Sequence, residues 1–212
     1  MLASYVMGLD LGPPGEPTGF AVLERPAAEA ARSEPEYHLR HLERFPPATS
    51  YPAIVESVAR RAGTPPLRGS PLVVDRTAVG KAIIDRLRRS NLAVKLVVIG
   101  AGQAVLPADG GGLLVPKKDL VTGLQLLLQS RRLKVAPGLP EAEMLANELS
   151  GFRLRYVPIG DSDLAEWRVG RHDDLVFAVA LACWYADRHR PLGPGAFTAG
   201  GSDLPRIMGM GF

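Results

Sequence analysis

Short apolar segments separated by turn-rich sequence dominate the first part of the chain. Residues 4–12, 20–25 and 36–45 have the length of strands, and each is largely apolar or alternates between apolar and polar positions. The stretch "PPGEPTG" between the first two is typical of a tight connection. Residues 49–63 then have helical spacing and end at a glycine. The chain is therefore predicted to open with an antiparallel meander followed by a helix.

The pattern changes at residue 71 to strand, helix, strand. An apolar strand ends at Asp75, residues 81–91 have helical spacing, and residues 92–100 form another apolar strand. Two strands joined in this way are predicted to be parallel, with a right-handed crossover. The remaining segments predict a hairpin across a glycine-rich turn, two helices, a late strand and a final helix, at residues 103–117, 117–133, 140–152, 153–160 and 174–186 in turn. This order predicts an α/β fold with a mixed sheet flanked by helices.

The final helix differs from the others because it is apolar on every side. Residues 175–186 carry no charge, so this helix is expected to be covered by the rest of the fold. Asp173 and Asp174 stand directly before this run. Two adjacent carboxylates at the edge of a core repel each other and lose hydration. The sequence therefore indicates a positive group close to them.

Two further acids, Asp10 and Asp75, each follow an apolar strand and precede a glycine by a few positions. Ligands bind just outside the carboxyl ends of strands in sheets whose faces are covered, so neighbouring strands would bring these carboxylates together. With an acid from the final helix they form a site that suits a hard divalent cation such as Mg²⁺. Each acid also has an ordinary structural explanation, because aspartate forms turns after strands and caps helices. Their occurrence together favours the metal site.

Composition limits the class of protein. The 212 residues are 46% hydrophobic and 22% charged, which suits one soluble globular domain. Cys183 is the only cysteine, which excludes an intrachain disulfide and fits a reducing compartment. The first residues contain no basic segment of a secretory signal, and the longest apolar run is too short to cross a bilayer, so we expect a cytoplasmic protein with no membrane partner. We expect one domain over residues 1–190 and a loosely ordered tail over residues 191–212.

Four segments, taken in order, resemble the nuclease domain of phage large terminase subunits. They are "GLDLG…TGFAVLE", "VVDRTAVG…IIDRLRRS", "VPKKDLVTGLQLLLQSRRLKVAPGLPEAEMLANEL" and "RHDDLVFAVALA", and the resemblance spans about residues 5–186. It implies an RNase H-like fold and a metal-dependent endonuclease that cuts double-stranded DNA during viral genome packaging. It also implies a packaging ATPase, a portal or a small terminase subunit as partners. The family's acids match Asp10 in the first strand, Asp75 in the fourth strand and Asp174 in the last helix, with Asp173 beside it.

Two departures from the family pattern stand in the sequence. No G-x-x-x-x-G-K-[ST] loop of an ATPase motor is present, since "TAVGKA" lacks both the upstream glycine and the hydroxyl residue. The chain is therefore expected to be either an isolated nuclease domain or a free-standing relative. Ala78 also replaces an expected glycine in the turn after Asp75.

The expected chemistry is hydrolysis of a phosphodiester bond with two Mg²⁺ or Mn²⁺ ions about 3.5–4 Å apart. Asp10 is the candidate that bridges both ions, and Asp75 and Asp174 would complete the two metal shells. Successive helical residues point about 100° apart, so Asp173 and Asp174 cannot both face one ion. The resemblance favours Asp174 as the ligand, with Asp173 capping the helix or supporting a metal-bound water. His172 is a candidate for orienting Asp173, although a histidine beside a helix start is more often structural.

Pairs of basic residues provide candidates for contacts to the DNA backbone. They are Lys117 and Lys118, Arg131 and Arg132, Arg153 and Arg155, and Arg168 and Arg171. Such pairs are usually solvated surface, but four of them in the half that supplies the last acid favour a phosphate track with little sequence preference. The hairpin near residues 101–118 is expected either to limit access to the site or to be an ordinary surface hairpin.

Three other functions remain open at the level of sequence. The same fold class includes actin-type and sugar-kinase ATPases, Holliday-junction resolvases, and DNA-binding modules without turnover. The acidic start of the last helix and the lack of a second glycine-rich loop disfavour the ATPase, and the complete set of acids disfavours the non-catalytic module. His38 and His41 have a spacing found in zinc sites, but without a matching second pair they are expected to be surface residues of a strand.

Overall fold

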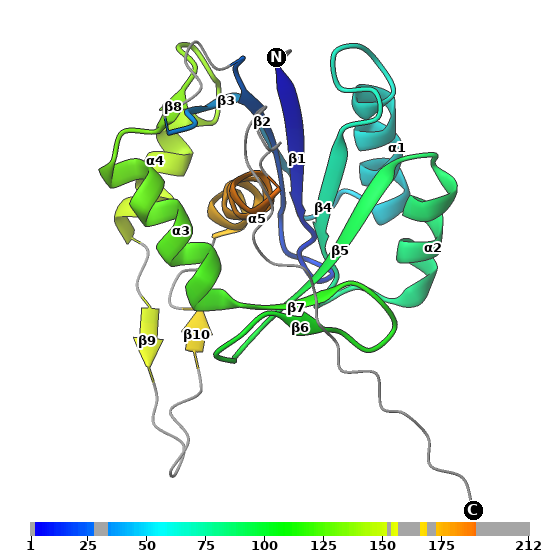
Figure 1. Ribbon diagram of the computed structural model, residues 1–212. Helices are drawn as coiled ribbons and strands as arrows, with labels where there is room; N and C mark the ends of the chain where they lie inside the picture. The colour runs from blue at the N-terminus through cyan, green and yellow to red at the C-terminus, as the bar shows by residue number, and fades with distance from the viewer. Residues whose placement is uncertain (1–2, 28–33, 152–153, 157–165, 169–172, 190–212) are drawn as a thin grey trace, which may run out of the picture.

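The main sheet has eight strands in the order β6-β7-β5-β4-β1-β2-β3-β8 (Figure 1). The structure is a computed structural model and describes residues 3–27, 34–151, 154–156, 166–168 and 173–189. The strands of the main sheet are β1 Ser4–Asp10, β2 Thr18–Arg25, β3 Tyr37–Phe45, β4 Pro71–Asp75, β5 Ala93–Gly100, β6 Leu106–Pro107, β7 Leu113–Pro116 and β8 Leu133–Val135. The helices are α1 Tyr51–Ala62, α2 Lys81–Arg89, α3 Lys117–Gln129, α4 Ala142–Gly151 and α5 Asp174–Arg188.

Strand directions agree with the two patterns in the sequence. The first three strands pair antiparallel in succession, as the meander predicts. Strands β4 and β5 are parallel and are joined by α2, and β4 also pairs parallel with β1. The hairpin of β6 and β7 joins the sheet through a parallel pairing of β7 with β5. The predicted mixed α/β sheet is therefore confirmed.

The sheet separates two hydrophobic cores. Figure 1 shows α1 and α2 over one face and α3, α4 and α5 over the other. Alternation along β1 divides its side chains accordingly, because Val6 packs in the core with α5, whereas Met7 and Leu9 pack in the core with α1 and α2. By the same alternation Asp10 of β1 and Asp75 of β4 belong to the α5 face, because they stand two positions after Gly8 and Val73.

Helix α5 lies directly on the backbone of the two central strands. A Cβ atom built at Gly8 of β1 would lie 2.0 Å from the carbonyl oxygen of Ala178, and one built at Gly19 of β2 would lie 2.2 Å from that of Asp174. Only glycine permits this approach. Every residue of α5 from Asp174 to Trp184 is buried, which confirms the prediction of a helix covered on all sides.

Short strands were not all evident from sequence. Strand β8 pairs parallel with β3 at the edge of the sheet, and β9 Leu154–Tyr156 pairs with β10 Glu166–Arg168 in a separate two-stranded sheet. Strand β9 confirms the predicted late strand, whereas three residues of β8 or β10 are too few to show alternation. Among the described residues no helix is long and apolar enough to span a bilayer. Residues 191–212 lie outside the described residues, so the predicted tail and the domain division at residue 190 stay predictions.

Candidate active site

One line of paired residues crosses four adjacent strands at the carboxyl ends of β1 and β4. Asp75 of β4 pairs with Asp10 of β1, Asp10 pairs with Gly19 of β2, and Gly19 pairs with Arg44 of β3. Asp10 and Asp75 are 1% and 6% exposed. Paired residues on neighbouring strands lie about 4.8 Å apart, so Asp10 and Asp75 stand side by side in the sheet. The sequence predicted this arrangement for the case that their strands are neighbours. We refer to these four residues as the cross-strand row.

The side chains of the row point toward α5. Asp10 is two positions after Gly8, whose Cα faces Ala178 of α5, so strand alternation places it on the same face. The same parity applies to Asp75 and Arg44, which are two positions after Val73 and Leu42 of the α5 core. The row therefore opens onto the side of the sheet that α5 covers.

The start of α5 completes the cluster. Because the Asp174 backbone rests on Gly19, the third acid sits over the middle of the row. Asp173 and Asp174 are 4% and 3% exposed. The start of α5 thus lies against the strand next to Asp10 and Asp75, although these segments are far apart in the sequence.

Asp75 is held by the turn that follows its strand. Its Oδ1 accepts hydrogen bonds from the Thr77 backbone N–H, at 2.9 Å, and from the Thr77 hydroxyl. The Thr77 hydroxyl oxygen in turn accepts from the Ile99 N–H of β5 at 2.9 Å. Asp75 therefore forms a turn, which is the ordinary structural explanation given for it in the sequence. The turn also fixes the position of its carboxylate. Thr77 was missed at the level of sequence, although an aspartate commonly accepts from the backbone N–H two residues on in such a turn.

The positive group beside Asp174 in this structure is Arg44. Its Nη2 donates to Asp174 Oδ1 at 2.5 Å and lies 3.2 Å from Glu148 Oε1 of α4. The Arg44 side chain is 17% exposed, and those of Asp174 and Glu148 are 5% and 6% exposed. Neither Arg44 nor Glu148 was predicted. Arg44 stands in a strand of mixed polarity and Glu148 on an ordinary amphipathic helix, so no local signal marks either one.

Glu148, not Asp173, supplies a side-chain acceptor to the start of α5. Asp173 occupies the N-cap position, but its side chain makes no capping hydrogen bond. Glu148 Oε2 instead accepts from the Val176 N–H at 3.3 Å. The expectation that the Asp173 side chain caps the helix is therefore corrected. A carboxylate from α4 reaches this N–H group and satisfies it.

Burial raises the pKa of Glu148 to about 7, and the negative charge of Asp174 adds to this shift. Arg44 and the hydrogen bond from Val176 act in the opposite direction but only partly offset it. The folded state therefore binds a proton at Glu148 more tightly than the unfolded state does. Stability is lost as the pH rises from the ordinary value of 4.5 to about 7, because ionisation then favours the unfolded chain.

We expect Glu148→Gln to remove this pH dependence. In buffer with EDTA, the melting temperature of the variant relative to the unmodified chain should rise between pH 4.5 and pH 7.5, because the unmodified chain alone loses stability over about that range. Thermal unfolding followed by circular dichroism measures the difference. Glu143→Gln, on an exposed residue of the same helix, is the matched control and should show no such trend. A constant difference for Glu148→Gln would contradict the raised pKa.

The donor set fits a hard divalent cation. Carboxylate oxygens are the ligands that Mg²⁺ and Mn²⁺ prefer. Asp174 Oδ2 is buried and has no hydrogen-bond partner among the described residues, so one oxygen is available to a ligand. The described side chains do not, however, include three or more His, Cys, Asp or Glu residues gathered closely enough to form a ready-made metal group. The ligand roles of Asp10, Asp75 and Asp174 stay predictions, and His172 lies outside the described residues.

The predicted basic residues fall into different parts of the fold. Lys117 is 8% exposed, and its Nζ lies 5.2 Å from the centre of the Phe177 ring in α5. Lys118 follows it and contacts the side chain of Gln103. Arg153 and Arg171, and the side chains of Arg155 and Arg168, lie outside what the structure describes. Among the described side chains of these pairs, Lys117 is thus the one that contacts the first turns of α5.

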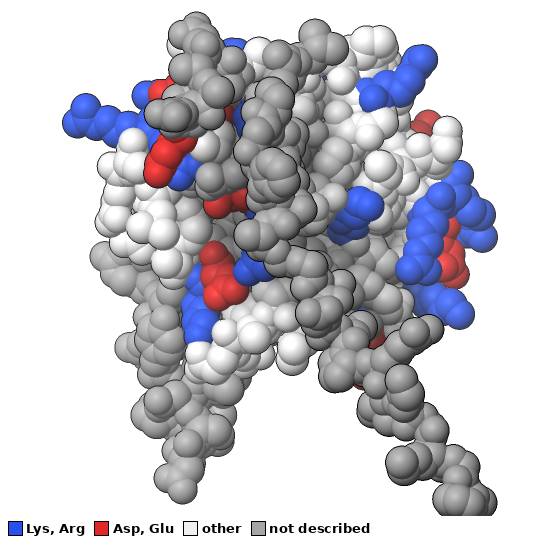
Figure 2. All heavy atoms as spheres, viewed as in Figure 1, with Lys and Arg blue, Asp and Glu red and all other residues white. Residues whose placement is uncertain are grey.

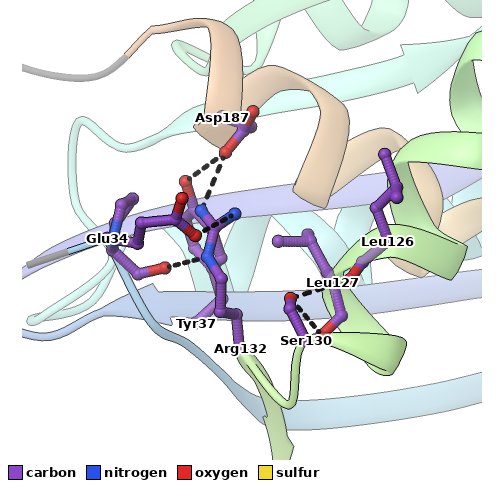
Figure 3. A network of polar contacts seen from close by, with 8 residues as sticks. Glu34, Tyr37, Leu126, Leu127, Ser130, Arg132 and Asp187 are labelled. Atoms are coloured by element: carbon purple, nitrogen blue, oxygen red, sulfur yellow. Dashed lines mark hydrogen bonds and ion pairs between the residues drawn. The ribbon is translucent and has the colours of Figure 1, made fainter.

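Arg132 belongs to a polar network at the opposite end of α5 (Figure 3). Its guanidinium lies 3.3 Å from a carboxylate oxygen of Glu34 and 3.3 Å from Asp187 Oδ1. The Tyr37 hydroxyl also donates to Asp187, at 3.1 Å. Asp187 is thirteen positions after Asp174 along the helix, which corresponds to about 20 Å. Arg132 therefore links the end of α5 to β3, while the neighbouring Arg131 is exposed.

We expect replacement by alanine to have different effects at the two arginines, on stability at Arg132 and on DNA binding at Arg131. Arg132→Ala should lower the free energy of unfolding by about 1–3 kcal/mol, because charged hydrogen bonds are lost. Arg131→Ala should leave stability unchanged and reduce the slope of log K against log[salt] by about one, because it removes one phosphate contact. Chemical denaturation and DNA-binding titrations measure the two effects. An unchanged slope for Arg131→Ala would show that this arginine does not contact the DNA backbone.

A further basic surface lies over α2. Figure 2 shows Lys and Arg side chains gathered there, and the last turn of this helix contains Arg86, Arg88 and Arg89. These residues were not among the predicted DNA contacts. His38 and His41 both lie in β3, where they are close to glutamates, His38 at 3.7 Å from Glu36 and His41 at 3.2 Å from Glu43.

Solved nuclease domains of terminases share this arrangement of strands and helices. The large terminase nuclease from thermophilic phage G20c is 22% identical over 85% of this chain and 81% of that chain, with a TM-score of 0.60. The same nuclease with bound zinc is 21% identical over 85% and 80%, with a TM-score of 0.56. The Mn-soaked terminase nuclease domain of human cytomegalovirus is 16% identical over 88% and 84%, with a TM-score of 0.52. No family profile and no curated protein sequence matches this chain.

Likeness at these identities establishes a fold. The mixed sheet with a meander followed by parallel strands, and the helices on both faces, agree with the architecture predicted from the sequence. The chain has the RNase H-like fold of the large terminase nuclease domains.

Proposed function

We propose that the chain is a metal-dependent endonuclease that hydrolyses phosphodiester bonds in double-stranded DNA, as in viral genome packaging, in the cytoplasm of a bacterial host. The observation that carries this proposal is the place of three buried acids: Asp10 and Asp75 are paired on adjacent strands, and the Asp174 backbone lies on Gly19, the residue paired with Asp10. Buried carboxylates that serve only the fold are rare and costly, so a cluster of them indicates a cation-binding site. The zinc-bound and Mn-soaked terminase nucleases support a divalent metal in this fold.

Asp10, Asp75 and Asp174 would hold the metal. Asp10 is central in the row and would be shared by two Mg²⁺ or Mn²⁺ ions, with Asp75 and Asp174 each completing one shell. When bound, such ions supply an activated water and neutralise the leaving oxygen of the phosphodiester, so no general-base side chain is required.

The chain's own residues fix these ligands and hold the substrate. Thr77 holds one oxygen of Asp75, and Arg44 holds one oxygen of Asp174. Asp173 would act beside Asp174 by supporting a bound water. Phosphates of the DNA would contact basic side chains outside the cluster, and the candidates are Lys118 in the first turn of α3, Arg131, Arg168 and Arg171. A packaging ATPase, a portal or a small terminase subunit would be the partner in the packaging reaction.

A plasmid-cleavage assay tests the proposal. The purified chain should convert supercoiled plasmid to nicked and linear forms with Mn²⁺ or Mg²⁺ and should be inactive with EDTA. Either ion should also raise the melting temperature, because it binds only the folded state. Absence of both cleavage and a melting shift at millimolar Mn²⁺ would overturn the proposal. Preferential cutting of a four-way DNA junction over linear DNA would instead support the resolvase alternative.

A further inference from the structure

The first acid of α5, Asp174, is already paired with a positive group of the chain itself, the guanidinium of Arg44. Arg44 donates to Asp174 Oδ1 at 2.5 Å and is also 3.2 Å from Glu148 Oε1. Both carboxylates are almost completely buried, so the guanidinium provides charge compensation that water cannot provide there. Arg44 reaches this position because β3 pairs with β2 so that Arg44 is opposite Gly19, directly under Asp174.

The two carboxylate oxygens of Asp174 differ in their contacts. Oδ1 is engaged by the guanidinium, whereas Oδ2 is buried without a hydrogen-bond partner among the described residues. A divalent ion at Oδ2 would therefore lie close to the positive charge of Arg44, and two cations sharing one carboxylate repel each other. The same contact, however, fixes the orientation of the Asp174 side chain before any ion arrives.

We infer that Arg44 is a positioning residue that acts as an intramolecular counter-ion: it holds Asp174 in place and competes with the divalent ion for the charge of that carboxylate. This inference rests on the proposed metal site. It has two consequences of opposite sign. Loss of the Arg44 charge should strengthen metal binding, and loss of the hydrogen bond should weaken cleavage. A residue that merely stabilised the fold would not strengthen metal binding when removed.

Two variants separate the charge of Arg44 from its hydrogen bonds, and a third serves as their control. Arg44→Gln removes the charge, and we expect it to bind Mn²⁺ about tenfold more tightly while its cleavage rate falls about 10–100-fold. Arg44→Lys keeps the charge without the planar fork, so it should bind Mn²⁺ with the affinity of the unmodified chain while also cutting more slowly. Arg40→Gln is the matched control, because Arg40 lies in the same strand and pairs with Glu24 away from the row.

Titration calorimetry with Mn²⁺ and plasmid cleavage provide the two readings. Weaker or unchanged Mn²⁺ binding by Arg44→Gln would overturn the inference, and so would tighter binding by Arg44→Lys, because charge would then not be the cause. If the unmodified chain binds Mn²⁺ and Arg44→Gln does not bind it more tightly, the inference alone fails. If the unmodified chain binds no Mn²⁺ at all, the proposed function fails and the inference fails with it.

Discussion

Replacing Asp174 by asparagine is expected to reduce DNA cleavage by at least about 100-fold, more than the loss of a residue that only supports a metal ligand. Asparagine has the same shape, so the backbone contact of residue 174 with Gly19 should survive and the fold should be kept. The substitution removes the negative charge next to Arg44 and the carboxylate oxygen that is buried without a hydrogen-bond partner among the described residues. Plasmid cleavage measures the loss, and circular dichroism checks the fold.

Asp173→Asn provides the comparison, because it makes the same chemical change one residue away. Asp173 is the N-cap residue and lies outside the helix that Asp174 begins, so we expect measurable cleavage with a weaker affinity for Mn²⁺. An Asp174→Asn protein that cuts as fast as the unmodified chain would reverse the assignment of the two acids.

The second large effect concerns the contact between α5 and the sheet. Gly8→Ala should lower the free energy of unfolding by about 3 kcal/mol, because the added methyl group would lie 2.0 Å from the Ala178 carbonyl oxygen and neither backbone can move easily. For a domain of this size the melting temperature should fall by about 6–12 °C. Differential scanning calorimetry measures the change.

Gly123→Ala is the control for the glycine substitution. Gly123 lies within α3, and a Cβ atom there would meet nothing within 4 Å. Alanine favours helix over glycine by about 1 kcal/mol, so this variant should be slightly more stable than the unmodified chain. A Gly8→Ala protein with the melting temperature of the unmodified chain would show that α5 does not rest on β1 as described.

The candidate acids could be identified from the sequence because each one stands at the end of a single strand or at the start of a single helix. Asp10 and Asp75 each end an apolar strand, and Asp174 opens an apolar helix, so strand and helix periodicity identifies all three. Asp10 and Asp75 were expected to lie close together if their strands were neighbours, and the pairing of β1 with β4 meets that condition. The fold was predictable for the same reason, since its main strands and helices are long enough to show their period.

The residues that surround the acids depend on distant parts of the chain. Arg44 reaches Asp174 only because β3 pairs with β2 in one register, which includes a shift between Val22 and Leu23. Glu148 reaches the Val176 N–H through the packing of α4 against α5. Neither register nor helix packing can be read from a single strand or helix. The sequence therefore indicated a positive group near Asp174, which we interpreted as a metal ion, and gave no sign of Arg44.

Anomalous diffraction from a crystal soaked in Mn²⁺ tests the metal site most directly. We predict an anomalous peak between Asp10 and Asp75, within about 2.5 Å of a carboxylate oxygen of each, and a second peak that includes Asp174 Oδ2. A crystal that binds Mn²⁺ elsewhere on the molecule, with no peak at Asp10, would contradict the metal-dependent site.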